Sequence, residues 1–508
     1  MSIIQAKQFM KGVLGTDSII IPALLSALLL IPAYPPFEQG YLAWVALIPL
    51  ITYSLKAKPV QALKAGLLFG ILFHLYVNFY LTHVLFTYLS WPLAILAMIL
   101  LVLYIGLYHG LFALTVNLVN RFNKPLFTAF AVPATWLLIE YLRSIGFLGY
   151  NVGYLGYSQW QYHNLLNLAA LYGYWGLPFI IILFQTITVL AVSKVLQENK
   201  LAAATAIFIL LVASGFILPS MATVEKEDDL IWTTLIQGNI QPTQIMGDRA
   251  EIKALYLDLT KQAVASGTDL VVWPETVIDL NFNQRKDHPG ELTKTADELD
   301  VAILYGARIR ENDKLYNSIT LYKPGFEELL VYNKVRLVPF VEYFPAEEIL
   351  NSVINLDLLL GSYSEGSDIT LFEIKNKPLA GIICFESYFG NHTRLFAVKG
   401  AHHLYVLTND AWFGRSIGLD QHAQAAAIRA AEMGIGVTQV ANSGITISFD
   451  YQGREMFRSA KQERETLTAS LDLARRDTFY NRYGDYFPAF WAIFLMIGIA
   501  LLAYRKFT

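Results

Sequence analysis

The sequence predicts a polytopic α-helical membrane protein that carries an α/β domain outside the cytoplasm. Two observations support this fold class. Of the 508 residues, 55% are hydrophobic and only 16% are charged, whereas soluble proteins average about 25% charged residues. The deficit is confined to residues 1–220, which contain 14 charged side chains, about 6% of that stretch, while the remaining residues reach about 23%. The first part is therefore predicted to lie in lipid, and the second to fold as an ordinary globular domain.

The same composition excludes several classes of protein. A wholly soluble enzyme and a disordered chain would carry more charge and less apolar surface. The net charge of −3 argues against charge-driven binding of nucleic acid, and a single cysteine excludes a disulfide scaffold.

Eight segments are apolar enough to be read as spans of a bilayer, which takes about 20 mostly apolar residues. Seven form the predicted transmembrane domain 1–220, and the eighth is a C-terminal helix within 486–508. The segments are 18–34, 41–55, 65–86, 92–119, 125–142, 174–193, 201–220 and 487–504. Residues 65–120 contain no Asp, Glu, Lys or Arg, which leaves room for two helices and a turn.

The short loops between the predicted spans alternate in charge, so that loops on one side of the membrane are basic and loops on the other side carry almost no charge. Basic residues gather on one side, at Lys7, Lys11, Lys56, Lys58, Lys64, Arg121, Lys124, Lys194, Lys200, Arg505 and Lys506. Arg143 is the exception, and Glu140 lies one helical turn before it, near enough to pair. By the positive-inside rule both termini are cytoplasmic, and the domain 221–485 lies on the opposite side of the membrane.

One outer loop, residues 146–164, is uncharged and rich in Gly and Tyr. Its aromatic residues indicate either interfacial anchors or a loop that helps to shape an entrance for lipids. The histidines of the helical part, His74, His83 and His109, have no carboxylate neighbours in sequence, which weakens a transporter interpretation.

Within 221–485, short β-rich runs alternate with helical patterns after a charged linker at 221–229. Strands are predicted at 231–237, 269–273, 301–307, 381–384, 403–407, 437–441 and 445–449, and helices at 249–265, 291–299 and 421–434. This alternation is typical of a layered α/β fold.

Three motifs follow or interrupt these elements, and chemistry in α/β sheets collects where strands end. In DLVVWPET, a proline ends the strand and places Glu275 on a rigid corner. The stretch YNKVRLVPFVEYFP contains Lys334 and Glu342, and in GIICFES Cys384 ends a buried strand with Glu386 two residues later. Each residue alone has an ordinary structural explanation, for example a packed thiol or a solvated lysine.

Together, these side chains supply what an acyl-transfer centre needs. A free thiol is mostly protonated at neutral pH, so it requires a base beside it, and the oxyanion that forms requires a positive group. Cys384, Glu275 and Lys334 are candidates for these three parts.

The motifs W-P-E, Y-x-K-x-x-L-V-P-F-x-E-Y-x-P and C-x-E, in this order, resemble the Glu–Lys–Cys motifs of the nitrilase (carbon–nitrogen hydrolase) superfamily. With seven predicted helices before them and one after, the chain resembles the apolipoprotein N-acyltransferase family. The resemblance implies an α-β-β-α sandwich, with Cys384 as the nucleophile, Glu275 as the general base and Lys334 as the oxyanion stabiliser.

The resemblance also implies supporting residues. Glu342 matches a second glutamate that orients the lysine, Glu386 and Trp412 match positions near the site, and Asn317 fits a further motif. The backbone N–H of Phe385, which stands where many members have tyrosine, is expected to complete the oxyanion hole. The resemblance also matches one further helix of the family, which we expect to be structural, at Gln421, His422, Arg429 and Glu432.

The implied reaction transfers an acyl chain from a membrane phospholipid to the N-terminal α-amine of diacylglyceryl-cysteine apolipoproteins, through a thioester on the cysteine. It completes lipoprotein biosynthesis in the bacterial inner membrane, with the catalytic domain in the periplasm. No cofactor, metal or nucleic acid is expected, and the pair His402–His403 lacks the spacing of metal ligands.

Two alternatives stay open. The first is a membrane-tethered amidase or nitrilase that uses the same three residues with water as the acceptor. The second is a transporter or sensor whose outer domain only binds a ligand.

Overall fold

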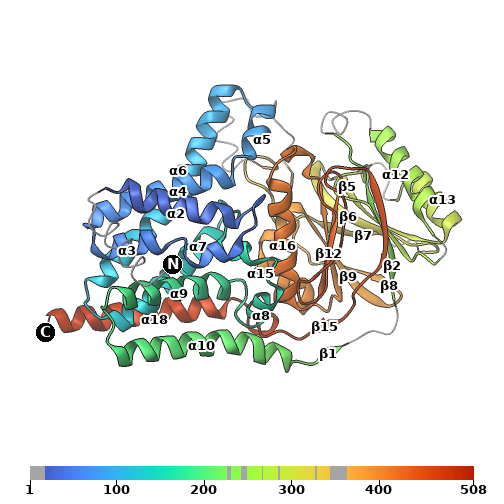
Figure 1. The fold of residues 1–508 in the computed structure, drawn as a ribbon. Helices are drawn as coiled ribbons and strands as arrows, with labels where there is room; N and C mark the ends of the chain where they lie inside the picture. Colours follow the sequence, from blue (N-terminus) through green and yellow to red (C-terminus); the bar gives the residue numbers. More distant parts are fainter. Residues whose placement is uncertain are drawn as a thin grey trace. The chain divides into compact units, whose positions relative to one another are not determined.

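The computed structural model describes residues 18–225, 230–241, 249–265, 267–283, 287–326, 329–343 and 363–507 (Figure 1). The chain divides into two compact units, one formed by Met1–Met221 with Tyr483–Thr508 and the other by Ala222–Arg482. We call them the helical unit and the α/β unit.

The helical unit consists of apolar helices joined by short turns. They are α2 (Ile20–Leu30), η1 (Ile31–Ala33), η2 (Gly40–Trp44), α3 (Ile48–Lys56), α4 (Pro59–Val77), α5 (Leu81–Tyr88), α6 (Trp91–Asn120), α7 (Pro125–Ser144), η3 (Leu155–Gln159), α8 (His163–Tyr172), α9 (Gly176–Val192), α10 (Glu198–Ser220) and α18 (Tyr486–Phe507). Within the described residues, 5 helices are long and apolar enough to cross a membrane, or 6 if the bent pair α8–α9 is one span. The predicted count of eight spans stays a prediction, because the two N-terminal apolar segments form shorter helices.

The predicted span 65–86 is divided in the structure, because a polar residue ends α4. The side-chain amide of Asn78 donates to the backbone carbonyl of His74 at 3.0 Å, and the Tyr150 hydroxyl donates to the Asn78 side-chain oxygen. These bonds satisfy the end of α4 away from water, and the chain then turns into α5.

The predicted span 174–193 begins after a sharp bend. Helices α8 and α9 meet at 109°, and Gly173 between them has φ 67°. This left-handed conformation favours glycine, which has no Cβ to clash with the backbone.

The loop 146–164 is folded into the helical unit, where it meets the two charged residues of α7. The Glu140 carboxylate accepts hydrogen bonds from the Leu155 backbone N–H at 2.9 Å and from the Tyr174 hydroxyl at 3.0 Å. The Arg143 guanidinium lies 4.3 Å from the centre of the Tyr154 ring. Tyr154, Tyr157 and Trp160 of this loop form part of the packed interior of the unit, whereas Phe147 and Tyr162 are exposed.

The α/β unit contains two large sheets. One has the order β14-β2-β3-β5-β6-β7, with β4 paired to β5, and the other has the order β13-β12-β11-β10-β9-β8. The strands of the first are β2 (Trp232–Gln237), β3 (Leu270–Val272), β4 (Ile278–Asn281), β5 (Ala302–Glu311), β6 (Lys314–Tyr322), β7 (Leu330–Asn333) and β14 (Glu465–Ser470). Those of the second are β8 (Leu371–Ile374), β9 (Lys377–Ile383), β10 (His403–Thr408), β11 (Gly436–Ala441), β12 (Ile447–Phe449) and β13 (Glu455–Arg458).

The two sheets face each other and are covered by helices on their outer sides. Tyr405 of β10 hydrogen-bonds to Thr233 of β2 across the interface, at 3.2 Å. Helices α12 (Arg249–Ala263) and α13 (Gly290–Leu299) pack on the first sheet, and α16 (Gly418–Met433), with α15 (Gly390–Val398) beside it, packs on the second (Figure 1). The predicted α-β-β-α sandwich is confirmed.

The parallel strands of each sheet determine where loops gather. Strands β2, β3 and β5 run parallel in one sheet, and β9, β10 and β11 run parallel in the other. Glu275, Cys384 and Trp412 follow the carboxyl ends of β3, β9 and β10, whereas Lys334 follows β7 and Asn317 lies in β6. The predicted linker 221–229 contains a short strand, β1 (Val224–Glu225), paired with β15 (Arg475–Arg476), and its residues 226–229 lie outside the described part of the chain.

Candidate active site

Glu275 lies on a corner directly after β3, as the Trp-Pro sequence predicts. The corner passes close to Gly306 of β5, where a Cβ would lie 2.6 Å from the Glu275 Cα, so a side chain at that position would displace it. The two carboxylate oxygens accept hydrogen bonds from the Asn317 side-chain amide at 2.7 Å and from the Asn409 backbone N–H at 2.9 Å. Burial raises the pKa of Glu275 and outweighs the opposing effect of Lys334.

Lys334 follows β7 and is almost completely buried, at 1% exposure. Its ammonium donates to Glu342 Oε1 at 2.8 Å and lies 3.9 Å from Glu275 Oε1. Burial alone would lower the pKa of Lys334, but the charges of Glu342 and Glu275 raise it above its usual value. The lysine is therefore a fixed positive charge between two carboxylates.

Asn317 of β6 joins the two carboxylates. Its side-chain amide donates to Glu275 at 2.7 Å and to Glu342 at 3.0 Å, while its backbone carbonyl accepts from the Lys334 backbone N–H at 2.8 Å. The other oxygen of Glu342 accepts from the Val338 backbone N–H at 2.8 Å, which fixes the carboxylate from the opposite side.

Cys384 is the first residue after β9 and begins the turn η5 (Cys384–Tyr388). Its φ of 51° is left-handed, a conformation that costs a residue with a Cβ roughly 1–2 kcal/mol. Burial raises the pKa of the Cys384 thiol, Glu275 and Asp410 raise it further, and Lys334 and a hydrogen bond with Thr408 act in the opposite direction. The strained backbone and this charged environment both indicate a functional residue.

Glu386 is fully buried and ties two turns together. One oxygen accepts from the backbone N–H groups of Val335 and Arg336, at 2.8 and 3.0 Å, just after Lys334. The other accepts from the Ile383 backbone N–H at 2.8 Å, just before Cys384. Although burial raises the pKa of Glu386, the nearby His392 and other donors bring it below its usual value, so the carboxylate stays ionised.

The two aromatic candidates lie on η5 and η6, the short helices that follow β9 and β10. The Phe385 ring packs against Phe389 with 5.1 Å between ring centroids. Trp412, half-buried in η6 (Asp410–Phe413), packs against the hydrophobic core that contains Trp273. Of the predicted site residues, the structure brings Glu275, Lys334, Glu342, Asn317 and Cys384 into one cluster. Glu386 holds the turn after Lys334 and the backbone just before Cys384.

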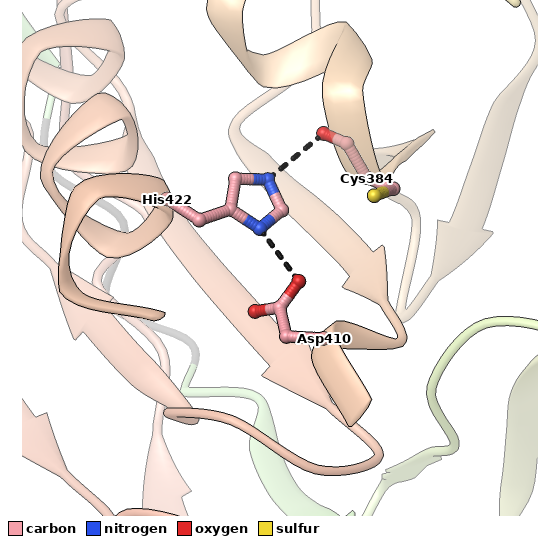
Figure 2. A group of neighbouring side chains, drawn as sticks. All are labelled: Cys384, Asp410 and His422. Carbon is pink, nitrogen blue, oxygen red and sulfur yellow. Dashed lines mark hydrogen bonds and ion pairs between the residues drawn. The ribbon is translucent and has the colours of Figure 1, made fainter. Parts of the chain in front are cut away.

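Sequence reasoning assigned no role in the site to Asn409, Asp410 or His422, and it treated His422 as part of a structural helix. His422 of α16 lies 2.9 Å from Asp410 through Nδ1 and 3.1 Å from the Cys384 carbonyl oxygen through Nε2 (Figure 2). Asn409, which supports Glu275, precedes Asp410. The sequence feature that could have indicated Asn409 and Asp410 is the polar run T-N-D at the end of strand β10.

Metal-ligating atoms also meet here. The Cys384 sulfur, a carboxylate oxygen of Asp410 and a ring nitrogen of His422 lie within 4.8 Å of one another, a spacing that could hold an ion. Both ring nitrogens already face hydrogen-bond acceptors (Figure 2), so binding of a metal would have to break one of those contacts.

Two family models match the chain. Residues 26–187 match the apolipoprotein N-acyltransferase N-terminal domain, and residues 233–480 match the carbon-nitrogen hydrolase family. The apolipoprotein N-acyltransferase of Geobacter metallireducens is 31% identical over 390 residues, which cover 74% of each chain. That of Haemophilus influenzae is 30% identical over 481 residues, which cover 91% of each chain.

Proposed function

The chain belongs to the apolipoprotein N-acyltransferase family, and on that premise we propose that it transfers an acyl chain from a membrane phospholipid to the N-terminal α-amine of diacylglyceryl-cysteine apolipoproteins. The observation that carries the proposal for the site is the cluster of buried Glu275 and Lys334 with the half-buried Cys384. This cluster holds a nucleophile, a base and a fixed positive charge.

In the first half-reaction, the Cys384 sulfur attacks the ester carbonyl carbon while Glu275 accepts the thiol proton. The negative charge that develops on the carbonyl oxygen is stabilised by the Lys334 ammonium and the Phe385 backbone N–H. The intermediate then expels the alkoxide of a lysophospholipid, which takes the proton from Glu275. A thioester between Cys384 and the acyl chain remains.

In the second half-reaction, the neutral α-amine of the apolipoprotein attacks the thioester carbonyl. Glu275 accepts a proton from the amine, and Lys334 again stabilises the oxyanion. Collapse of this intermediate forms the amide and releases the Cys384 thiolate, which recovers the proton from Glu275. Atoms and charge balance over the two steps, and the enzyme returns to its starting state.

The electrostatics of the site favour transfer of the thiol proton to Glu275 over its loss to water. Burial and the negative charges of Glu275 and Asp410 raise the pKa of the Cys384 thiol, so a free thiolate is unfavourable at this position. Transfer of the proton to Glu275 removes one negative charge where another forms, so the charge of the cluster is unchanged. The raised pKa of Glu275 makes this carboxylate a stronger proton acceptor.

The supporting residues have distinct parts in this proposal. Glu342 accepts a hydrogen bond from the Lys334 ammonium, and the Asn317 side-chain amide donates to Glu342 and to Glu275 and so fixes both carboxylates. Glu386 holds the turns that carry the lysine and the nucleophile. Trp412 lies two residues after Asp410 in η6 and packs against the hydrophobic core.

We place the enzyme in the bacterial inner membrane, with residues 1–220 and 486–508 as transmembrane domains and residues 221–485 in the periplasm. The apolar helices support a membrane location, and the basic loops support cytoplasmic termini. Both substrates are lipids that diffuse in the same bilayer.

Mass spectrometry of the purified protein after exposure to phospholipid tests the proposal. We expect an added acyl mass on Cys384, no thioester in Cys384→Ser and little in Glu275→Ala. Addition of a diacylglyceryl lipopeptide should then remove the adduct and form an amide-linked acyl product. Free fatty acid without this amide would support the amidase or nitrilase alternative, and absence of any adduct would contradict the nucleophile.

A further inference from the structure

The imidazole of His422 faces two hydrogen-bond acceptors at once. Its Nε2 lies 3.1 Å from the backbone carbonyl oxygen of Cys384, and its Nδ1 lies 2.9 Å from Asp410 Oδ1 (Figure 2). A carbonyl oxygen only accepts hydrogen bonds, so the contact with Cys384 is a hydrogen bond when Nε2 carries a proton, and the Ser387 hydroxyl 3.2 Å from the same nitrogen then acts as a second acceptor. An ionised carboxylate also only accepts, so its hydrogen bond needs a proton on Nδ1 as well. With both hydrogen bonds formed and Asp410 ionised, His422 is therefore a cation.

The surroundings of His422 favour this charge state. Burial alone would lower the pKa of His422, but the charge and hydrogen bond of Asp410 raise it, with support from the Cys384 carbonyl and Glu275. The Asp410 and His422 side chains are 0% and 2% exposed, so water screens their interaction little.

The pair contacts the nucleophile's turn at several points. Besides the Cys384 carbonyl, His422 Nε2 lies 3.2 Å from the Ser387 hydroxyl. The His422 ring also stacks on the Tyr388 ring at 17°. On the other side of the pair, the Thr408 hydroxyl donates to Asp410 at 2.8 Å and also hydrogen-bonds with the Cys384 thiol. Asp410 and His422 thus reach both the backbone and the side chain of Cys384.

The geometry also indicates what His422 does not do. Its two nitrogens are directed at a backbone carbonyl and a carboxylate (Figure 2), so it is not placed as the base that takes the thiol proton. That part stays with Glu275 in the proposed function.

We propose that the Asp410–His422 ion pair is a positioning device for the nucleophile. The imidazolium holds the Cys384 carbonyl and keeps this residue in its left-handed conformation, so that the sulfur faces Glu275 and Lys334. The inference rests on the proposed function, because it assumes that Cys384 forms the thioester.

The test measures single-turnover acylation of Cys384 by phospholipid in the full-length protein. In His422→Leu we expect the rate constant to fall by about 100-fold, while the phospholipid KM stays within about 3-fold, because the sulfur is misplaced but the lipid pocket is intact. In His422→Gln, the side-chain N–H can still reach the carbonyl, and we expect recovery of at least about 10-fold over the leucine variant.

A matched control is His403→Gln. His403 is another buried histidine with two hydrogen-bonding partners, the Thr438 hydroxyl and the Asp472 carbonyl, but it does not contact the Cys384 turn. We expect this control to acylate within about 3-fold of the wild type. An equal loss in the control, a wild-type rate in His422→Leu, or no recovery in His422→Gln would each overturn the proposal.

A second measurement does not depend on folding of the His422 variants. In nitrogen-15 histidine NMR at about pH 8.5, most histidines are neutral, and we expect one doubly protonated imidazole to remain. It should persist in His392→Gln, which removes another buried histidine beside a carboxylate, Glu386 at 3.3 Å. A spectrum with only neutral imidazoles would refute the ion pair.

The two proposals fail differently. If the wild-type protein forms no thioester, the proposed function is wrong. If the wild type forms the thioester and His422→Leu forms it equally fast, only the positioning inference is wrong.

Discussion

Lys334 and Glu342 form a buried ion pair, with 2.8 Å between the ammonium and Oε1 and side-chain exposures of 1% and 9%. Glu275 lies farther from the same ammonium, at 3.9 Å. The two carboxylates are therefore not equivalent. Glu342 is the nearer partner of the lysine, and in the proposed function Glu275 is the carboxylate that takes the proton from the thiol.

Replacement of Glu342 by Gln should slow acylation of Cys384 by about 10- to 100-fold, because the lysine loses the partner that orients it toward the oxyanion. The rate of acyl-adduct formation, followed by mass spectrometry, measures this effect. Asp279→Asn is the control, since it breaks the more exposed Asp279–Arg308 pair and should change the rate little. Equal rates in Glu342→Gln and wild type would show that the ion pair has no catalytic part.

Replacement of Glu275 by Gln should increase the rate at which iodoacetamide alkylates Cys384 at pH 8, although it abolishes acyl transfer. Burial is the main reason for the raised pKa of the thiol, but the Glu275 charge adds to it, so removal of this charge lowers the pKa and increases the thiolate fraction. A decrease of one unit would give about tenfold faster alkylation at a pH below the pKa. Because the chain has one cysteine, the reaction reports on this site alone.

Lys334→Met should have the opposite effect on the same assay. Lys334 lowers the pKa of the Cys384 thiol, so its removal raises the pKa, and alkylation should require a more alkaline pH. The pH dependence of alkylation in the two variants should therefore move in opposite directions from the wild type. A shift of both profiles in the same direction would contradict this account of the site's charges.

Glu386→Gln should lower stability by about 2 kcal/mol or more, because neutral Gln cannot provide the carboxylate that accepts the N–H groups of Val335, Arg336 and Ile383. The denaturation midpoint of the detergent-solubilised protein measures the loss. Glu373→Gln, at an exposed position of β8, serves as the control. A midpoint equal to that of the wild type would mean that these hydrogen bonds are dispensable.

The membrane orientation can be tested with introduced cysteines in a Cys384→Ser background. Lys314→Cys, exposed in β6, should react with a membrane-impermeant maleimide in intact spheroplasts. Lys58→Cys, exposed beside α4, should react only after permeabilisation, because the basic loops predict that it faces the cytoplasm. Reversal of the two patterns would place the α/β unit in the cytoplasm.

Much of the fold could be predicted from the sequence, because the strongest signals for its elements are local. Proline after Trp273 predicts the corner at Glu275, and an apolar run predicts β9 up to the nucleophile. Other strands gave weaker local signals: β6 and β7 were not predicted, although they position Asn317 and Lys334. Asn78 was also overlooked as the end of α4, since its effect depends on a hydrogen bond from Tyr150.

The Asp410–His422 contact could not be derived from local patterns. The two residues lie on different elements, η6 and α16, and meet only when α16 packs on the sheet that carries β10 and β9. A histidine within an alanine-rich helix therefore resembles an ordinary packing residue until its tertiary partners are known.

The position of Glu386 also bears on how substrates are exchanged. Its single carboxylate accepts hydrogen bonds from the backbone beside Lys334 and beside Cys384, so it joins these two segments to each other. A phospholipid and a lipidated polypeptide must enter in succession, and both are bulky. We therefore expect the motions that admit and release them to come from other loops, with little change in the distance between the Lys334 ammonium and the Cys384 sulfur.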